Sequence, residues 1–330
     1  MSTCATLVAV VGPTGVGKTA LAIALARRFD VEIVNADSRQ VYTGMDIGTA
    51  KPTAEELRAA RHHLINIRRP DAPFSLGEYL PLARDSITDI VSRGKLPILC
   101  GGTGQYVWAL LEGWQVPQVR PNADLRAELE RRASAEGATA LYRELHSLDP
   151  QRAESIGPHN TRRIIRALEI HHAHGGSVAA GAKSAEPPYR ARIIGLTADR
   201  ATLYQRIDER FDAMMDAGLL DEARRLAGEG YTLGAGVLSG VGYSELGQHL
   251  AGEVTLPDAI ARAKTQTHRL VRRQYTWFKP ADPRIAWLDA TSGLPIDAAS
   301  SLVQKFMESP APCDTIANDS PRANPGTEFQ

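Results

Sequence analysis

The feature that most constrains how this chain can fold is a glycine-rich segment, GPTGVGKT, at residues 12–19. It fits the pattern G-x-x-x-x-G-K-S/T, follows the apolar run of residues 7–11 and precedes a helical pattern that starts at Ala20. In this strand–loop–helix context, backbone N–H groups turn towards one point and the helix adds the positive end of its dipole. The segment therefore predicts a P-loop in which Lys18 reaches terminal phosphate oxygens and the Thr19 hydroxyl holds Mg²⁺. The alternative is a turn that only joins a strand to a helix.

Length, charge and cysteine content narrow the class of protein further. With 330 residues, 43% of them hydrophobic and 23% charged, the chain can bury the core of one or two globular domains. Its formal net charge is +0, so that binding of a polyanion must come from local clusters of Arg and Lys. The cysteines Cys4, Cys100 and Cys313 lack disulfide or metal-site spacing, which favours the reducing cytoplasm. Without a signal-peptide pattern or a long apolar stretch, we expect no membrane insertion.

Strand-like and helix-like segments alternate along much of the chain. The predicted strands are residues 6–11, 31–34, 96–100, 192–196 and 285–288, and the predicted helices include 20–28, 75–93 and long segments from Asp199 and Leu256. Such alternation is typical of βαβ units, which build a parallel sheet. The sequence therefore predicts an α/β fold, a P-loop nucleotide-kinase-like core whose parallel sheet is flanked by helices.

Two polar turns follow predicted strands. Asp37 comes just after the strand 31–34, and the turn Gly101–Gly104, which contains Thr103, follows the strand 96–100. Ligands of open α/β sheets bind beyond the carboxyl ends of strands, so that Asp37 and Thr103 are expected to face the P-loop. Each side chain could instead serve only to cap a turn or helix. The strand 96–100 lacks the terminal Asp of motor-type ATPases, which favours a group-transfer enzyme of nucleotide-kinase type.

The organisation of the chain changes after residue 116. Residues 122–148 have helical periodicity, and 161–170 forms an amphipathic helix in which Arg162 and Arg166 are one turn apart. We therefore predict a catalytic core, an inserted all-helical domain and a disordered tail. The predicted boundaries are 1–116 and 190–308 for the core, 117–189 for the insertion and 309–330 for the tail.

Three further patterns stay open on the residues alone. Arg206 and Arg210 are one turn apart beside acidic residues, as on a solvated, salt-bridged helix face. The segment 256–279 mixes basic with aromatic residues, which fits RNA contact and an ordinary amphipathic helix equally well. The glycine-rich segment 234–247 is predicted to be a loop.

Taken in order, seven segments resemble the tRNA dimethylallyltransferases of bacterial type, a family also called tRNA isopentenyltransferases. They are GPTGVGKT, ADSRQVYTGMDIGTAKP, HHLINI, LPILCGGTGQY, RRIIRALEI, LYQRIDERFDAMM and RRQYTWF, and they span about residues 5–290. The resemblance implies transfer of a dimethylallyl group from dimethylallyl diphosphate to N6 of adenosine 37, beside the tRNA anticodon, with Mg²⁺ as cofactor. It also implies a helical insertion that binds the anticodon stem-loop. We expect a cytoplasmic monomer that does not bind membranes.

The resemblance assigns roles by position. Asp37 matches the general base that accepts the N6 proton, Thr103 a threonine that positions the substrates, and Lys18 a cation that neutralises the leaving group. The residues expected to bind diphosphate are Gly12, Pro13, Thr14, Gly15, Val16, Gly17, Lys18, Thr19 and Arg210. Those expected to contact tRNA are Asp37, Ser38, Arg39, Gln40, Thr103, Arg126, Arg162, Arg163, Ile164, Ile165 and Arg166. The residues that depart from those usual in the family are Asn160, Ser239, Ser244 and His268.

Rival interpretations share parts of this pattern. A small-molecule kinase would use the same P-loop for ATP, and an isopentenyltransferase could act on free adenine nucleotides. The insertion with Arg162, Arg163 and Arg166 argues against both, because neither needs to grip a stem-loop. A non-catalytic RNA-binding module would need neither a complete P-loop nor Asp37.

Overall fold

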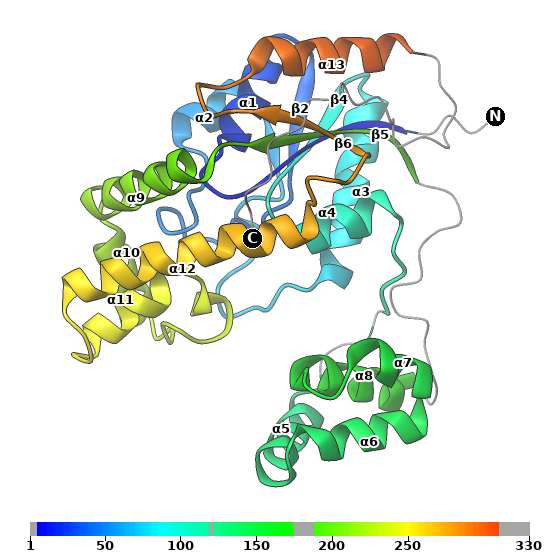
Figure 1. Cartoon of the computed structure of the whole chain (residues 1–330), viewed down its shortest axis with the longest axis vertical. Helices are drawn as coiled ribbons and strands as arrows, with labels where there is room; N and C mark the ends of the chain where they lie inside the picture. Colours follow the sequence, from blue (N-terminus) through cyan, green and yellow to red (C-terminus); the bar gives the residue numbers. More distant parts are fainter. Residues whose placement is uncertain (1–4, 118, 120–121, 175–187, 310–330) are drawn as a thin grey trace. The chain divides into compact units, whose positions relative to one another are not determined.

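The computed structural model describes residues 5–117, 119, 122–174 and 188–309, which form two compact units (Figure 1). One unit comprises the chain up to Gly113 together with the chain from Ser184 onward, and the other comprises Trp114–Lys183. The predicted disordered tail lies, from residue 310, outside the described residues, as do Cys4 and Cys313. In the described part of the chain, no helix is both long and apolar enough to span a membrane.

Six parallel strands form the sheet of the first unit, in the order β3-β2-β4-β1-β5-β6. The strands are β1 (Ala5–Val11), β2 (Val31–Asn35), β3 (His62–His63), β4 (Leu96–Cys100), β5 (Tyr189–Thr197) and β6 (Ile285–Asp289). Cys100 is in register with Val10 on one side and Asn35 on the other, while Val11 is in register with Gly195. The central strands therefore end at one edge of the sheet. The predicted α/β fold with a parallel sheet is confirmed.

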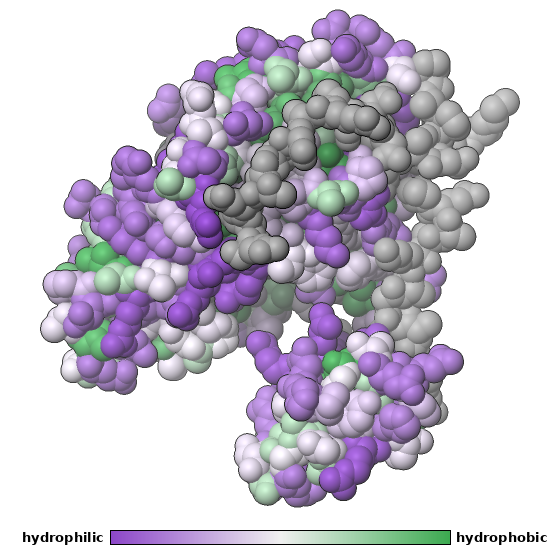
Figure 2. Space-filling model, viewed as in Figure 1, coloured by the Kyte–Doolittle hydropathy of each residue, from purple (hydrophilic) through white to green (hydrophobic). Residues whose placement is uncertain are grey.

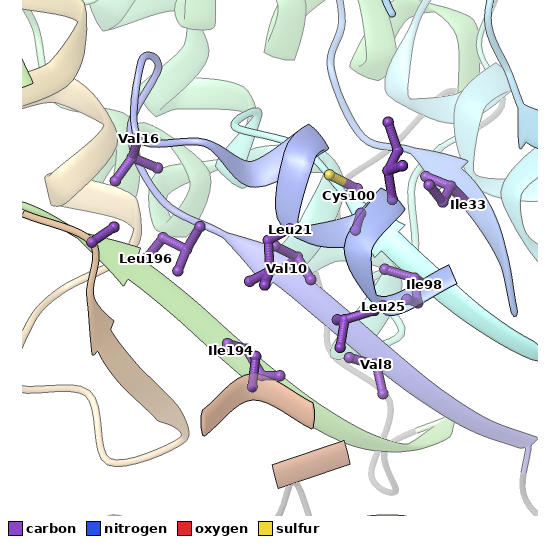
Figure 3. Close-up of a cluster of buried hydrophobic side chains, with 14 of the residues drawn as sticks. Val8, Val10, Val16, Leu21, Leu25, Ile33, Ile98, Cys100, Ile194 and Leu196 are labelled. Atoms are coloured by element: carbon purple, nitrogen blue, oxygen red, sulfur yellow. The ribbon is translucent and has the colours of Figure 1, made fainter. Parts of the chain in front are cut away.

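Helices cover both faces of this sheet. On one face lie α1 (Lys18–Ala26) and α13 (Ile296–Glu308), and on the other lie α3 (Leu76–Ser92) and α4 (Gly104–Leu111) (Figure 1). Figure 3 shows the first of these interfaces, where alternate strand residues such as Val8, Val10 and Ile98 meet Leu21 and Leu25 of α1. All five side chains are fully buried, and each contributes roughly 1.5–3 kcal/mol through burial. This core holds the loops beyond the strands in place.

The first unit contains further helices. They are α2 (Ala54–Ala59), α9 (Arg200–Asp216), α10 (Leu219–Gly228), a short 3₁₀ helix (Gly236–Ser239), α11 (Tyr243–Leu250) and α12 (Leu256–Trp277). The predicted loop 234–247 is wrong in part, because the short 3₁₀ helix occupies Gly236–Ser239 and α11 begins at Tyr243. The Glu245 carboxylate accepts a hydrogen bond from the Gly242 N–H (2.8 Å), and Tyr243 and Leu246 are buried in a second hydrophobic cluster. Capping and burial therefore outweigh the poor helix propensity of glycine.

The second unit is a small helical bundle. Its helices are α5 (Ala123–Glu136), α6 (Ala138–Leu148), α7 (Pro150–Ile156) and α8 (Thr161–His174). Leu129 of α5, Leu141 and Leu145 of α6, and Ile164 and Leu168 of α8 form its core. Along the chain, this unit follows β4 and α4 and precedes β5, both strands being part of the sheet. The unit is therefore an insertion between neighbouring parts of the α/β unit.

Candidate functional site

Three loops meet at the carboxyl edge of the sheet. Backbone hydrogen bonds run from the Ala36 N–H to the Cys100 carbonyl (2.8 Å) and from the Thr103 N–H to the Ala36 carbonyl (3.1 Å). The Gly101 N–H in turn bonds to the Val10 carbonyl at the end of β1 (3.3 Å). The loop after β2 and the turn after β4 are thus fixed to each other and to the start of the P-loop.

The P-loop connects β1 to α1 through a backbone that only glycine can adopt at its first position. Gly12 has φ 138°, and a Cβ there would lie 2.4 Å from the Leu196 carbonyl oxygen of β5. Gly17 then caps α1 in the left-handed region, and Lys18 opens the helix. The Lys18 ammonium group donates to the Pro13 carbonyl oxygen (2.7 Å), so that it curls back over the loop. The loop and its cation therefore point to one place, as an anion site requires.

The charge of Lys18 is held in an unfavourable environment. Burial lowers the pKa of its ammonium group from 10.5 to about 8, and the nearby Cys100 and Asp37 only partly oppose this effect. Below that pH the group is a desolvated cation without a direct salt bridge among the described residues. Such a cation binds an anion strongly, because little water has to be removed from it.

Asp37 is held in a fixed orientation by the end of β2. Its N–H donates to the Asn35 side-chain oxygen (3.0 Å), and its Oδ1 accepts from the Arg39 N–H (2.8 Å). The predicted alternative, a turn cap, therefore applies to one carboxylate oxygen. The other oxygen makes no hydrogen bond within the described residues, and the side chain is partly exposed. A carboxylate held in this way can accept a proton from a substrate.

The Thr103 hydroxyl faces the same loop. It accepts a hydrogen bond from the Ser38 N–H (3.0 Å) and lies 3.3 Å from the Ser38 hydroxyl oxygen. Thr103 is the N-cap residue of α4, but its side chain makes no capping hydrogen bond. Its hydroxyl therefore orients the loop of Asp37 rather than the helix that it precedes.

Two arginines of α9 have different surroundings although they are one turn apart. Arg206 donates to the carbonyl oxygens of Ala290 and Thr291 (2.9 and 2.8 Å) and so holds the chain after β6. Arg210 donates to the Thr14 hydroxyl of the P-loop (2.7 Å). Burial lowers the pKa of Arg210, and the attraction of Asp37 opposes this effect. The structure thus brings Arg210 to the P-loop, away from the solvated helix face that the sequence pattern alone favours.

A cavity of about 460 Å³ joins these groups. Residues that line it include Thr14, Asp37, Thr103, Arg210, Gln274 and Trp277. Its apolar wall includes Ile207, Phe211, Met214 and Leu270. The polar groups therefore converge on a space that is partly lined by hydrophobic side chains, as in many small-molecule sites.

Residues 45–50 form a loop that lines part of the cavity, and a residue far away in the sequence holds this loop in place. The buried Glu222 carboxylate accepts hydrogen bonds from three successive backbone N–H groups, those of Asp46, Ile47 and Gly48 (2.8, 2.8 and 3.0 Å). It also accepts from the Tyr243 hydroxyl (2.7 Å). The sequence did not predict this role, because Glu222 lies more than 170 positions from the loop it binds. The sequence did not predict a role for Gln274 either, although this residue lies in RRQYTWF, one of the segments that resemble the family.

The residues expected to contact RNA differ in their availability. Arg39 donates to the Val237 carbonyl (2.6 Å), and Gln40 donates to the carbonyls of Thr49 and Ala50 (3.2 and 3.0 Å). Both side chains are thus engaged in holding neighbouring loops.

Within the helical unit, a buried carboxylate pairs with two of the expected arginines. Glu169 accepts from Arg126 (2.7 Å) and lies 3.4 Å from Arg166. Arg162 and Arg163 are exposed at the start of α8, beside an open hollow lined by residues 156–162. Ile164 and Ile165 have buried side chains in the core of the unit. Arg162 and Arg163 therefore carry exposed positive charge, whereas the two isoleucines serve packing.

The residues at the P-loop fit a metal ion that is held largely by a substrate. The Thr19 hydroxyl is partly exposed and makes no hydrogen bond within the described residues. The described part of the chain contains no group of three or more His, Cys, Asp and Glu side chains that could hold a metal ion. Mg²⁺ prefers such sites, where one or two protein oxygens and substrate phosphates bind it together with water.

The fold and this site define a P-loop α/β protein of nucleotide-kinase type, with a carboxylate beside its anion site and a helical insertion. The comparisons with known proteins name the family. A family model described as IPP transferase matches residues 40–281. The tRNA dimethylallyltransferase of Roseiflexus sp. (strain RS-1) is 50% identical over 302 residues, 92% of this chain and 99% of the relative. The chain therefore belongs to the IPP transferase family, and the predicted resemblance is confirmed.

Solved structures agree with this assignment. The tRNA isopentenylpyrophosphate transferase of Bacillus halodurans matches with a TM-score of 0.67 and 41% identity, covering 92% of this chain and 95% of that one. A eukaryotic dimethylallyltransferase acting on tRNA matches with a TM-score of 0.76 and 28% identity, covering 94% and 81% of the two chains. The likeness thus extends over nearly the whole chain.

Proposed function

We propose that this protein transfers the dimethylallyl group of dimethylallyl diphosphate to N6 of adenosine 37 in tRNA and releases diphosphate. The observation that carries the proposal is that Asp37 and Arg210 line one cavity, and that Asp37 lies close enough to Lys18 and Arg210 to favour the charge of each. A small-molecule kinase can use the same cations together with a carboxylate base that accepts a hydroxyl proton, so these groups fit both reactions. The membership of the IPP transferase family favours transfer of the prenyl group.

Asp37 is the proposed general base. In the reaction, the bond between N6 and C1 of the allyl group forms, and the bond between C1 and the diphosphate oxygen breaks. The N6 proton passes to the carboxylate oxygen of Asp37 that is not engaged with Arg39. Thr103, whose hydroxyl orients the Ser38 segment, positions the adenine beside this base.

The P-loop is the proposed site of the leaving diphosphate. Residues Gly15 to Thr19 offer backbone N–H groups, and Lys18 and Arg210 supply positive charge as the charge of the leaving group grows. Mg²⁺, held by Thr19 and the diphosphate oxygens, would supply further charge neutralisation. Ile207, Phe211 and Met214 would shield the allylic carbon from water. The anion site of this P-loop is therefore proposed to hold an isoprenoid diphosphate rather than ATP.

The second substrate is proposed to be the anticodon stem-loop of tRNA. Adenosine 37 must leave the base stack to reach a cavity, and unstacking of this kind costs a few kcal/mol, which backbone contacts have to offset. Arg162 and Arg163 of the helical unit are exposed and would contact phosphates, giving affinity without sequence information. The segment Asp37–Gln40 would contact the loop of the RNA near the base.

We further propose that the protein acts as a monomer in the cytoplasm. On the face shown in Figure 2, hydrophobic residues are scattered among hydrophilic ones and form no large continuous patch. The proposed active site draws all its residues from one chain, so the chemistry needs no second copy. Light scattering at micromolar concentration measures the mass directly.

The test is a transfer assay with radiolabelled dimethylallyl diphosphate and unmodified tRNA, followed by mass analysis of the nucleosides. We expect labelled N6-dimethylallyladenosine only when Mg²⁺ is present. A parallel reaction replaces the tRNA by AMP, and another replaces the prenyl donor by ATP. Transfer to AMP in preference to tRNA, or phosphorylation without prenyl transfer, would refute the proposal.

A further inference from the structure

The side-chain amide of Gln274 joins the two halves of the candidate site. Its Oε1 accepts a hydrogen bond from the Thr14 N–H (2.8 Å), and its Nε2 donates to the Gly102 carbonyl oxygen (3.1 Å). Because one partner is a donor and the other an acceptor, the orientation of the amide is determined. Gln274 is only 9% exposed, so that bulk water competes little with these bonds. One buried side chain of α12 thus links the P-loop to the turn after β4.

The hydrogen bond from Gln274 to this turn depends on the absence of a side chain at position 102. A Cβ on Gly102 would lie 2.3 Å from Gln274 Nε2 and 3.5 Å from the Lys18 ammonium nitrogen. A side chain at this position would therefore push Gln274 away and break its bond to the turn. Gly102 and Gln274 are thus complementary in shape, although the two residues are 172 positions apart in the sequence.

The two hydrogen-bond partners of the Gln274 amide belong to the proposed binding sites of two different substrates. On one side, Thr14 also accepts from Arg210 through its hydroxyl (2.7 Å) and belongs to the proposed diphosphate site. On the other side, Gly102 precedes Thr103, whose hydroxyl accepts from the Ser38 N–H (3.0 Å). The amide of Gln274 therefore spans the gap between the group that binds the donor and the group that faces the acceptor.

The residues next to Gln274 hold it in place. The Tyr275 hydroxyl lies within hydrogen-bond distance of the Thr197 hydroxyl of β5 (2.8 Å), and the Trp277 carbonyl accepts from the Trp108 indole N–H of α4 (2.9 Å). The last turns of α12 are therefore attached to β5, α4 and the two site loops. A side chain carried by such a rigid segment can fix a distance.

We propose that Gln274 is a positioning residue that sets the separation between the donor and acceptor halves of the active site. This inference rests on the proposed function. C1 of the allyl group and N6 of the adenine come from the two halves, and a misplacement of about 1 Å can lower the rate of such a reaction roughly 100-fold. The P-loop and the Asp37 turn keep their own hydrogen bonds without Gln274. Its loss therefore slows turnover more than it weakens the binding of either substrate.

The experiment compares Gln274→Met with Gln266→Met in the full-length protein. Methionine has nearly the volume of glutamine but can make neither hydrogen bond, and Gln266 lies two turns earlier on α12, outside the cavity lining. We expect Gln274→Met to lower kcat about 30-fold while both KM values change less than about threefold. Binding of inorganic pyrophosphate, measured by calorimetry, should also change less than about threefold. Gln266→Met should behave as the unchanged protein.

A third variant keeps the test decisive if Gln274→Met does not fold. Gln274→Glu retains the acceptor for the Thr14 N–H but places a carboxylate oxygen against the Gly102 carbonyl, and it should also lower kcat by at least about tenfold. An unchanged kcat in the folded variants overturns the inference, and so does a loss confined to pyrophosphate binding. Absence of transfer by the unchanged protein would instead refute the proposed function, which separates the two failures.

Discussion

The two ends of the central sheet both carry charged side chains, but only one end pairs them. At the amino end, the Glu32 carboxylate of β2 is 2% exposed and bonds to Arg93 (2.7 Å) and His63 (2.7 Å), with Lys95 at 3.3 Å. The hydrogen bonds from Arg93 are the main reason that the pKa of Glu32 lies well below its usual range. Glu32, Arg93 and Lys95 thus each have a partner that stabilises the ionised form.

At the carboxyl end, positive charge is in excess. Lys18 and Arg210 donate to uncharged oxygens, those of Pro13 and Thr14, and the pKa of each is lowered because burial disfavours its charge. Asp37 is the carboxylate that attracts them. The same sheet therefore has paired charges at its amino end, which hold strands together, and unpaired cations at its carboxyl end, where an anionic ligand can bind. Three substitutions test whether the two ends differ in this way.

The largest effect is expected for Asp37→Ala. Loss of the proposed base should lower kcat about 1,000-fold, within the range seen for general bases. Filter binding should show that tRNA affinity falls less than about fivefold, because phosphates supply most of the affinity. The matched control is Asp30→Ala, which removes a carboxylate that pairs with Lys95 at the amino end (3.2 Å) and should leave kcat unchanged. Near-normal turnover of Asp37→Ala would show that the base is another group.

A smaller effect, on stability, is expected for Glu32→Leu. Removal of this buried carboxylate leaves Arg93 and Lys95 with only their more exposed partners, Asp89 and Asp30, and should lower the free energy of unfolding by about 2 kcal/mol. Urea titration measures the change, and kcat at saturating substrate should remain that of the unchanged protein.

The pH dependence of this difference follows from the lowered pKa of Glu32. The folded protein holds the carboxylate ionised below the unfolded pKa of about 4.3, so the stabilisation is complete above that pH and fades as pH falls. The gap between the two proteins should therefore narrow below about pH 4. A gap that stays constant to pH 3 would mean that Glu32 acts through packing instead.

The smallest effect is expected for Lys18→Met, with the opposite sign. The folded pKa of about 8 lies below the unfolded value of 10.5, so the folded state binds fewer protons between these pH values and its stability rises with pH there. At pH 7 the buried charge is a cost, and Lys18→Met should raise the free energy of unfolding by about 1–2 kcal/mol. Lys95→Met at the amino end should lower it. Equal signs for the two lysines would remove the contrast between the ends of the sheet.

Local patterns in the sequence predicted much of the site. The P-loop follows from its spacing, and Asp37 and Thr103 follow from their places after β2 and β4, since parallel strands end at one edge. The predicted helix 75–93 likewise matches α3, which begins after Ser75, where both capping hydrogen bonds between Ser75 and Glu78 are present. Each of these inferences needs only neighbouring residues and the rule that strands are parallel.

Other parts of the site depend on contacts between distant segments. On the residues alone, Arg206 and Arg210 look alike, and only the packing of α9 against the P-loop distinguishes them. Gln274 meets Thr14 across 260 positions, so its role has no local pattern. In the helical unit, the availability of Arg126 depends on Glu169, 43 positions away. Sequence periodicity specifies which face a residue occupies but not which distant group it meets.

The thiol of Cys100 can report how often the sheet opens. It ends β4 just before the turn of the candidate site, and burial raises the pKa of its thiol to about 12. Its sulfur is both protonated at neutral pH and screened by the packed sheet, so that an alkylating reagent must wait until β4 separates from its neighbours. The rate at which Cys100 is alkylated therefore measures how often the sheet opens. A ligand that binds the surrounding loops together would make these openings rarer and lower the alkylation rate.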